Sequence, residues 1–271
     1  MRLKFVLIGF LGLALAGCSS DEDNVNDVNS GNYFPLSNNY VWEYENKDTD
    51  EIAGLAENKI IEELTANALG DNRFGFTSSL EGDINQGVAT GILSRGTLTK
   101  SNGQLIYNGN FSFNPDGLDA GTDLNIPIQN LIIYDKNKST GGVLSSVKQQ
   151  LDQTIVLEGS SVPVTIDVEL KTIQNAFIDQ FNAGDITYED ILKTSLVLEL
   201  KIDANLFIPL NILPQQEVFT QVNFFAEDIG LIFSESDLNY NFSDALGQIA
   251  PNFPTSGSQS SSQTIVNYYF K

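Results

Sequence analysis

The chain has 271 residues and a formal net charge of −21, from 35 acidic and 14 basic side chains. This negative balance argues against binding nucleic acid or anionic lipid by charge, because both need a positive protein surface. The chain has no histidine and one cysteine, which excludes histidine-dependent catalytic triads, intramolecular disulfides and zinc sites built from these residues.

The first residues are typical of a secretory signal peptide. Arg2 and Lys4 precede an apolar run from Phe5 to Ala16, which is shorter than the roughly 20 residues of a membrane-spanning helix. Leu15-Ala16-Gly17-Cys18 follows and resembles the lipobox of bacterial lipoproteins. The resemblance implies cleavage after residue 17, a diacylglyceryl group on the Cys18 sulfur and an acylated new amino terminus. We therefore expect a membrane partner, reached through the Cys18 lipid.

Residues 18–32 are expected to be a lipid-bearing, flexible tether, because their polar composition cannot bury enough apolar area to fold. The tether opens with the possible export tag Ser19, Ser20, Asp21, Glu22 and Asp23. A serine rather than an aspartate after the cysteine favours the outer membrane, by resemblance to enterobacterial lipoproteins. The acidic triplet resembles the export signal of surface-displayed lipoproteins. We expect outer-membrane anchoring, with the cell surface slightly favoured over the periplasmic face.

Strands dominate the first half of the remaining chain. Tyr33 begins the folded part, and strands are predicted at residues 40–45, 58–69, 73–79 and 125–135, with a weaker segment at 141–150. Residues 58–69 also fit a helical stripe, but their position between strands favours a strand. Residues 88–99 and 104–113 form the clearest hairpin, because the Asn-Gly pair between them accepts the positive φ of a tight turn.

The second half continues this pattern. Residues 153–157 and 162–173 are expected to pair, and the second of them alternates as a half-buried strand does. Further elements are predicted in this order: one or two helical turns at 175–181 and 188–193, a strand at 195–208 broken by Pro209 and Pro214, a hairpin of 217–227 with 231–236, a loop at 243–263 and a strand at 264–269.

Together these elements predict an all-β or β-rich α+β fold. We expect about ten to twelve strands in a single antiparallel curved sheet, half-barrel or barrel, with one or two short helices. No strong boundary divides residues 33–271, which are predicted to be a single domain behind the signal peptide (1–17) and the tether (18–32).

Two patches resemble a loose group of uncharacterised bacterial lipoproteins. Tyr33-Phe34-Pro35-Leu36 with Asn39-Tyr40-Val41-Trp42-Glu43-Tyr44 is similar to their opening, and residues 225–232 are similar to a later hairpin. Phe225 stands where the group usually has tryptophan or tyrosine. The resemblance implies a curved sheet wrapping a helix, similar to the half-barrel of the periplasmic lipoprotein carrier, and implies no activity.

A polar segment is the best candidate for a metal site. Asn114, Asp116, Asp119 and Asp123 offer oxygen ligands among glycines, which suits calcium. The spacing is not that of an EF-hand, and an ordinary turn region explains the same composition. We expect no cofactor, and calcium at these four residues is the weaker alternative.

Tyr40, Trp42 and Tyr44 lie on one face of the first predicted strand, by the two-residue period. They could form a platform on which a sugar stacks. Aromatic residues also dominate protein cores. The core is the favoured interpretation.

No catalytic signature is present. Phosphate-binding glycine loops are absent, and no carboxylate pair stands out among 35 acidic residues. The chain is therefore expected to be a lipid-anchored, non-catalytic binding or interaction protein. The apolar alternation at 162–173 and 195–208 suggests a concave face for a hydrophobic ligand or an unknown protein's segment. Alternatives are a surface glycan-binding lipoprotein and, less favoured, a carboxylate-based glycoside hydrolase.

Overall fold

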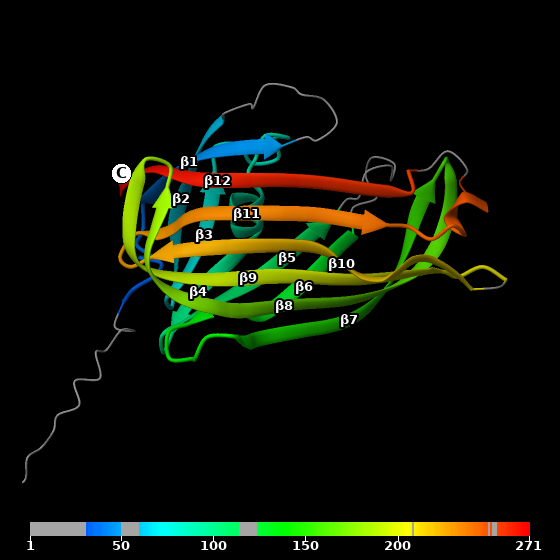
Figure 1. Ribbon diagram of the computed structural model, residues 1–271, viewed down its shortest axis with the longest axis horizontal. Helices are drawn as coiled ribbons and strands as arrows, with labels where there is room; N and C mark the ends of the chain where they lie inside the picture. The colour runs from blue at the N-terminus through cyan, green and yellow to red at the C-terminus, as the bar shows by residue number, and fades with distance from the viewer. Residues whose placement is uncertain (1–30, 50–59, 114–123, 208, 249, 251–253) are drawn as a thin grey trace, which may run out of the picture. The chain divides into compact units, whose positions relative to one another are not determined.

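The structure is a computed structural model that describes residues 31–49, 60–113, 124–207, 209–248, 250 and 254–271. Residues 31–271 form one compact unit. Its twelve strands make one sheet in the order β6-β5-β4-β3-β2-β1-β12-β11-β10-β9-β8-β7, and each neighbouring pair is antiparallel. Two meanders of six strands thus meet where β1 pairs with β12 (Figure 1). The predicted single antiparallel curved sheet is confirmed.

The elements have the following bounds. The first meander contains β1 (Tyr40–Thr49), β2 (Ile60–Gly70), β3 (Arg73–Ser78), β4 (Gly96–Ser101), β5 (Gln104–Phe113) and β6 (Leu124–Asp135). The second contains β7 (Gly142–Leu157), β8 (Ser160–Ala183), β9 (Ile186–Ala204), β10 (Leu210–Ala226), β11 (Gly230–Asn241) and β12 (Ser256–Phe270). Helix α1 (Val88–Ser94) lies between β3 and β4, and a 3₁₀ turn, η1 (Leu246–Gln248), lies between β11 and β12.

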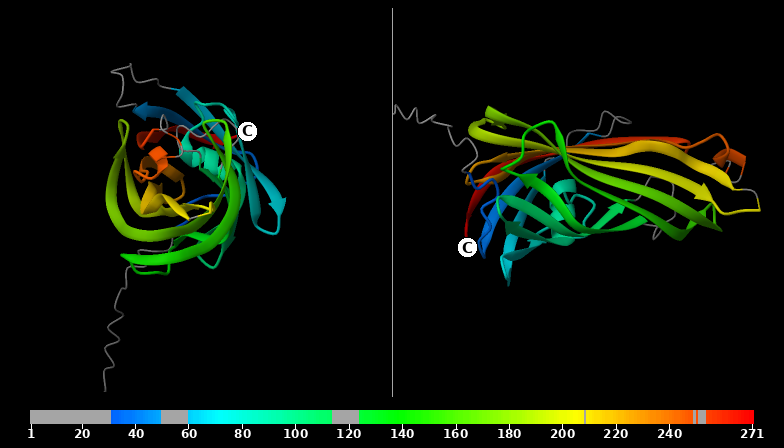
Figure 2. Two further views of the ribbon diagram at one scale, coloured as in Figure 1. Left: turned by 90° about the vertical axis from the view of Figure 1, so that its right-hand side faces the viewer. Right: turned by 90° about the horizontal axis from the view of Figure 1, so that it is seen from below.

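The sheet curves into a barrel-like wall that is nearly closed, and α1 and η1 lie inside it (Figure 2). Side chains of β7 and β8, rather than a backbone ladder, link the edge strand β6 to the opposite edge of the sheet, and we call this junction the seam. The Ile132 N–H donates to Ser145 Oγ at 3.1 Å, and Thr172 Oγ1 donates to the Ile132 carbonyl at 2.6 Å. Gln174 Oε1 accepts from the Asp135 N–H at 3.1 Å. These bonds satisfy edge groups that would otherwise be left without partners inside the protein.

Tight turns set the register of the hairpins, as predicted. Asn102 and Gly103 have φ values of 52° and 81°, and Glu158 and Gly159 have values of 47° and 78°. Positive φ at both central residues is the mark of a primed two-residue turn, whose twist matches that of the flanking strands. The predicted strands at 40–45, 58–69, 73–79 and 125–135 are also present, with shifted ends.

Residues 88–94 correct the first hairpin prediction. They form α1, and only β4 and β5 form the hairpin. Val88, Ala89, Ile92 and Leu93 pack against the core, and their spacing is that of one helical face. In so short a segment the same apolar residues also fit a strand. Contacts with residues distant in sequence therefore determine whether the segment is a helix or a strand.

The two helical turns predicted at 175–181 and 188–193 are wrong. Both segments continue β8 and β9, past a register shift between Gln174 and Ala176. The extended hairpin curls over the outer face of the sheet (Figure 1), where the rings of Phe181 and Phe224 stack 4.0 Å apart and Phe233 lies 5.5 Å from Phe181. This packing outside the barrel favours strands over the local helical pattern.

The loop predicted at 243–263 is also partly wrong, since β12 begins at Ser256. Its serine- and glutamine-rich half pairs with β11 on one side and with β1 on the other. Pro214 does not end β10, which contains it within the register shift between Leu213 and Gln216. Ladder pairing overrides the low strand propensity of the β12 serines, and the register shift accommodates a proline, which cannot donate to a ladder.

The interior of the barrel-like sheet is filled differently at its two ends. One end is aromatic and contains Tyr33, Phe34, Trp42, Phe76, Tyr134 and Phe225. The other contains the aliphatic side chains of β8 and β9, and Leu246 and Ala250, which are buried as well. Among the described residues, no helix is long and apolar enough to cross a membrane.

Candidate functional site

Helix α1 forms one wall of the candidate site, and its first turn is held by side chains of the sheet. The Gly87 N–H donates to Glu62 Oε2 at 2.9 Å. The Ala89 and Thr90 N–H groups donate to Gln263 Oε1 at 2.6 and 3.1 Å. The helix has no side-chain cap at its own N-cap residue. β2 and β12 therefore satisfy the backbone donors that every helix start leaves free.

Glu62 is the centre of this attachment. Its side chain is fully buried and also accepts from Asn46 Nδ2 at 2.7 Å, Thr90 Oγ1 at 2.8 Å and Ser78 Oγ. Within the described part of the chain, no lysine or arginine forms an ion pair with it. Hydrogen bonds alone therefore compensate its burial, and they fix α1 to β1, β2 and β3.

Tyr107 of β5 holds the other end of the helix. Its hydroxyl donates to the Ile92 carbonyl at 2.9 Å, one of the acceptors that a helix end leaves free. Burial raises the pKa of Tyr107 to about 12, because the ionised form loses its hydration. The hydroxyl stays protonated in neutral solution and keeps its role as a donor.

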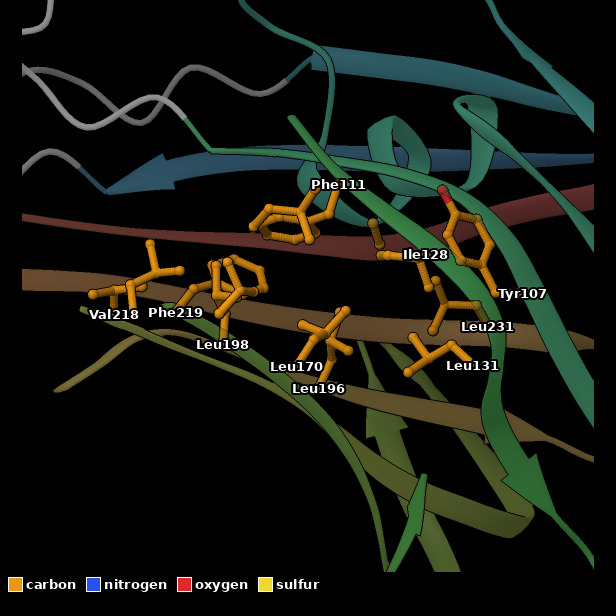
Figure 3. Close-up of a cluster of buried hydrophobic side chains, with 14 of the residues drawn as sticks. Tyr107, Phe111, Ile128, Leu131, Leu170, Leu196, Leu198, Val218, Phe219 and Leu231 are labelled. Carbon is orange, nitrogen blue, oxygen red and sulfur yellow. The ribbon is translucent and has the colours of Figure 1, made fainter. Parts of the chain in front are cut away.

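A cavity of about 240 Å³ lies between α1, β5 and strands β10 to β12. We call it the large cavity because it is larger than the second interior cavity described below; two more open hollows, on β7 to β10 and on β10 and β11, have about 430 Å³ each. Its apolar lining includes Val88, Ile92, Phe111, Phe219 and Leu238. The rings of Phe111 and Phe219 face each other across the interior, 5.2 Å apart (Figure 3). Two opposite sides of the barrel-like sheet thus meet beside the cavity.

The rim of the large cavity is exposed and carries both signs of charge. Asp83, Arg95 and Asn110 lie at the rim and are exposed to solvent. The Arg95 backbone N–H donates to the carbonyls of Ile92 and Leu93 at the end of α1. These bonds fix the backbone from which the guanidinium group extends. The rim connects the cavity to solvent.

The sheet wall of the large cavity carries polar side chains. Ser236 and Ser261 are cross-strand neighbours, 5% and 8% exposed, and both line the cavity. Neither hydroxyl forms a hydrogen bond with another described residue. Buried hydroxyls are normally paired, so these two are available to a bound molecule.

A second, small cavity of about 40 Å³ lies deeper and shares Ile92 with the large one. Thr194, Gln221 and Asn223 line it on the sheet side, and Phe34, Leu93 and Leu105 line it on the other. A space of this size holds about one or two water molecules. We therefore regard the large cavity as the site for a ligand.

The aromatic residues proposed as a platform are in the core. Tyr40 is 5% exposed, and Trp42 and Tyr44 are fully buried. Trp42 Nε1 donates to the Ile229 carbonyl at 2.7 Å, and the Tyr44 hydroxyl donates to the Leu231 carbonyl at 3.0 Å. A sugar can stack only on an exposed ring, so this strand offers no platform.

The other predicted site residues lie outside the described residues. They are the lipidation site Cys18, the tag Ser19, Ser20, Asp21, Glu22 and Asp23, and the calcium candidates Asn114, Asp116, Asp119 and Asp123. Where the structure describes the chain, no group of three or more aspartates, glutamates or cysteines could hold a metal ion.

The sequence did not indicate the polar residues that line the interior. Six of them form one row across six neighbouring strands, which we call the polar row: Gln174, Thr194, Asn223, Ser234, Gln263 and Asn46. All are buried. The only local signal is in β10, where Gln221 and Asn223 alternate with Val222 and Phe224 in a stretch, residues 218–226, that is mostly buried.

The chain was compared with protein-family models, with curated proteins and with solved structures, and none of these comparisons gave a match.

Proposed function

We propose that this chain is a lipid-anchored, non-catalytic binding protein that holds a small ligand, or one end of a larger one, in the large cavity. The observation that carries the proposal is the cavity itself. It is a concave space of about 240 Å³ whose lining combines apolar side chains with polar and charged ones, and a concave site that joins apolar walls to convergent polar groups is typical of ligand binding. Its walls are fixed by the bonds to Glu62, Gln263 and Tyr107.

The position of the ligand differs from the one expected for a hydrophobic partner. The alternating residues of 162–173 and 195–204 pack into the core with other side chains of the chain, including Leu170 and Leu198 (Figure 3). A lipid chain would have to displace them. The large cavity needs no such displacement, and this supports a compact ligand over an acyl chain.

Methyl NMR of the full-length chain in detergent tests this proposal, with cyclohexanol as the probe. We expect saturable shifts of the Ile92 and Leu238 methyl signals, because both side chains line the cavity. The Ile202 methyl signal should stay unchanged, because Ile202 lies in the core away from the cavity. If the cavity signals do not move at any cyclohexanol concentration that the fold tolerates, the proposal is wrong.

Two filling variants sharpen the test. Ile92→Trp fills the space between the two cavities and should abolish the shift of Leu238. Gly91→Leu is the second variant, because a Cβ there meets its nearest atom, in Gln86, at 3.6 Å, an ordinary contact. Binding that persists in a folded filling variant would place the ligand elsewhere.

The anchor is proposed from the sequence around Cys18. Cells given radiolabelled palmitate should label the natural chain and leave Cys18→Ser unlabelled, while Ser19→Ala keeps the label.

Protease added to intact cells should degrade the chain if it faces outward, as the acidic tag suggests. Label on the Cys18→Ser chain would contradict the anchor, and protection of the chain from protease would contradict the outward orientation.

A further inference from the structure

The chemistry of the interior wall indicates what kind of ligand the large cavity takes. The polar row crosses the interior where a barrel-like sheet of this size would normally be apolar. Its members are between 0% and 8% exposed. Each buried polar side chain without a partner costs about 1–3 kcal/mol. A row of six buried polar residues therefore calls for a reason.

The two ends of the polar row have structural tasks. Gln174 of β8 joins the end of β6 to the opposite edge of the sheet. Its amide accepts from the Asp135 N–H at 3.1 Å and donates to the Lys138 carbonyl at 2.8 Å. Gln263 and Asn46 hold α1 at the other end, by direct bonds to the helix and through Glu62. These residues are explained without a ligand.

The middle of the wall is not explained in this way. Gln221 Nε2 donates to Ser234 Oγ at 2.9 Å, and Ser234 in turn donates to Asn223 Oδ1 at 3.0 Å. Ser236 and Ser261 lie beside these hydrogen bonds, in register with Gln221 across β10, β11 and β12. The two serine hydroxyls line the large cavity without a partner among the described residues.

The wall recognises uncharged groups. Amides and hydroxyls make up the polar row and its neighbours, and the buried carboxylate of Glu62 is occupied by five donors. At the rim, Asp83 and Arg95 have opposite charges. A charged ligand would leave water for a site that has no net opposite charge to offer, which is unfavourable.

The other walls of the large cavity limit the shape and size of the ligand that it can hold. Ile92 of α1 and Phe111 of β5 give the cavity an apolar side that faces the sheet wall. Phe219 and Leu238 lie on the sheet wall itself, beside the serines. A cavity of about 150 Å³ holds a benzene ring, and drug-sized ligands need roughly 300–1,000 Å³. The volume of about 240 Å³ therefore suits one six-membered ring with substituents.

We propose that the large cavity binds one neutral sugar ring, either a free monosaccharide or the terminal unit of a glycan. This inference rests on the proposed function, that the cavity is a ligand site. The apolar side packs against the C–H face of the ring, and the hydroxyls of Ser236 and Ser261 bond to its hydroxyl edge. The open rim lets the rest of a longer glycan extend into solvent.

The test repeats the methyl titration with the neutral methyl glycosides of glucose, galactose and mannose, and with galacturonate as the charged counterpart. We expect at least one neutral glycoside to shift the Ile92 and Leu238 signals at lower concentration than cyclohexanol does. Galacturonate should bind more weakly than methyl galactoside. Each serine hydroxyl that bonds to the sugar contributes about one hydrogen bond. Ser236→Ala and Ser261→Ala should thus each weaken glycoside binding about five- to tenfold and leave cyclohexanol binding within about twofold.

The outcomes separate the two proposals. Ser258→Ala is the matched control, because this serine of β12 is exposed and lies outside the cavity lining. If cyclohexanol binds and no neutral glycoside does, the sugar inference is overturned and the proposed function stands. If the serine variants weaken both kinds of probe equally, the serines are structural and the inference is also overturned. If no probe binds, both proposals fail.

Discussion

Glu62 is a buried carboxylate whose role depends on accepting hydrogen bonds rather than on pairing with a cation. Its Oε2 accepts from Asn46, Gly87 and Thr90, and its Oε1 accepts from Ser78. One side chain thus joins three strands to the start of α1. A group that satisfies several buried donors at once is a point where a single substitution has a large effect.

Substitution of Glu62 should distinguish accepting capacity from charge. Glu62→Leu leaves the donors of Asn46, Gly87 and Thr90 without an acceptor and should lower the free energy of unfolding by about 3 kcal/mol or more. Glu62→Gln keeps one oxygen for these donors, and the Ser78 hydroxyl can turn to accept from the amide. The loss should then be about 1 kcal/mol, measured by urea unfolding.

The control for both variants is Glu235→Leu, on the exposed side of β11, which should change stability by less than about 0.5 kcal/mol. Equal losses in Glu62→Gln and Glu62→Leu would mean that the negative charge itself is needed, contrary to this account.

Single residues also show where sequence reasoning reaches its limit. The shared strand face of Trp42 and Tyr44 favours a position in the core, and a local period is enough for that prediction. Ser236 and Ser261 could not be assigned to a site. They become a pair only through the register of β11 with β12, and no local pattern encodes which serine of a serine-rich strand faces inward.

At the scale of elements, the local sequence pattern predicts the hairpin turns. It does not predict secondary structure correctly where packing outside the barrel-like sheet determines it. Asn102-Gly103 sets its turn by itself, and Glu158-Gly159 adopts similar positive φ values, so local sequence predicts where these two turns lie but not where the strand before Asn102 begins. Phe177 and Phe181 have the spacing of a helical stripe, but they belong to a strand whose hairpin covers the outer face of β10 and β11. No feature near residue 180 indicates that partner.

The outer aromatic cluster should hold the β8–β9 hairpin in place. Phe181→Ala removes the ring that stacks 4.0 Å from Phe224. Because Phe181 is half-buried, we expect a loss of about 1–2 kcal/mol, below that of a fully buried phenylalanine. Hydrogen exchange should quicken in residues 177–190 and stay unchanged in β11 and β12. Ile186→Ala, at the exposed tip of the hairpin, is the control, and a uniform rise across the sheet would contradict a local role.

At the scale of the whole molecule, the fold is a sheet that almost closes and fills its interior with its own elements. The aromatic end, the aliphatic end with η1, and α1 leave only part of the interior open. Side chains of β7 and β8 close the seam. This arrangement confines the candidate site to the middle of the barrel-like sheet, between α1 and strands β10 to β12.

The buried tyrosines make the whole fold sensitive to alkali. Burial raises the pKa of Tyr107 to about 12, and burial with nearby Glu227 and Asp190 raises that of Tyr33 to about 12. Burial also raises the pKa values of Tyr44 and Tyr134. In the unfolded chain these groups ionise near pH 10. Between pH 10 and 12 the folded chain therefore holds protons that the unfolded chain has lost.

Stability should consequently be complete below pH 10 and fall as the pH rises toward 12. Each such tyrosine removes about 1.4 kcal/mol per pH unit in this range, so four of them remove about 5.6 kcal/mol per unit. Since domains are stable by about 5–15 kcal/mol, the sheet should unfold before these tyrosines ionise within it. Circular dichroism and the 295 nm absorbance of tyrosinate should then change together. Tyr107→Phe should reduce the slope of unfolding free energy against pH by about 1.4 kcal/mol per unit. An unchanged slope, or tyrosinate absorbance that rises well before the strand signal falls, would show that these rings reach solvent in the folded protein.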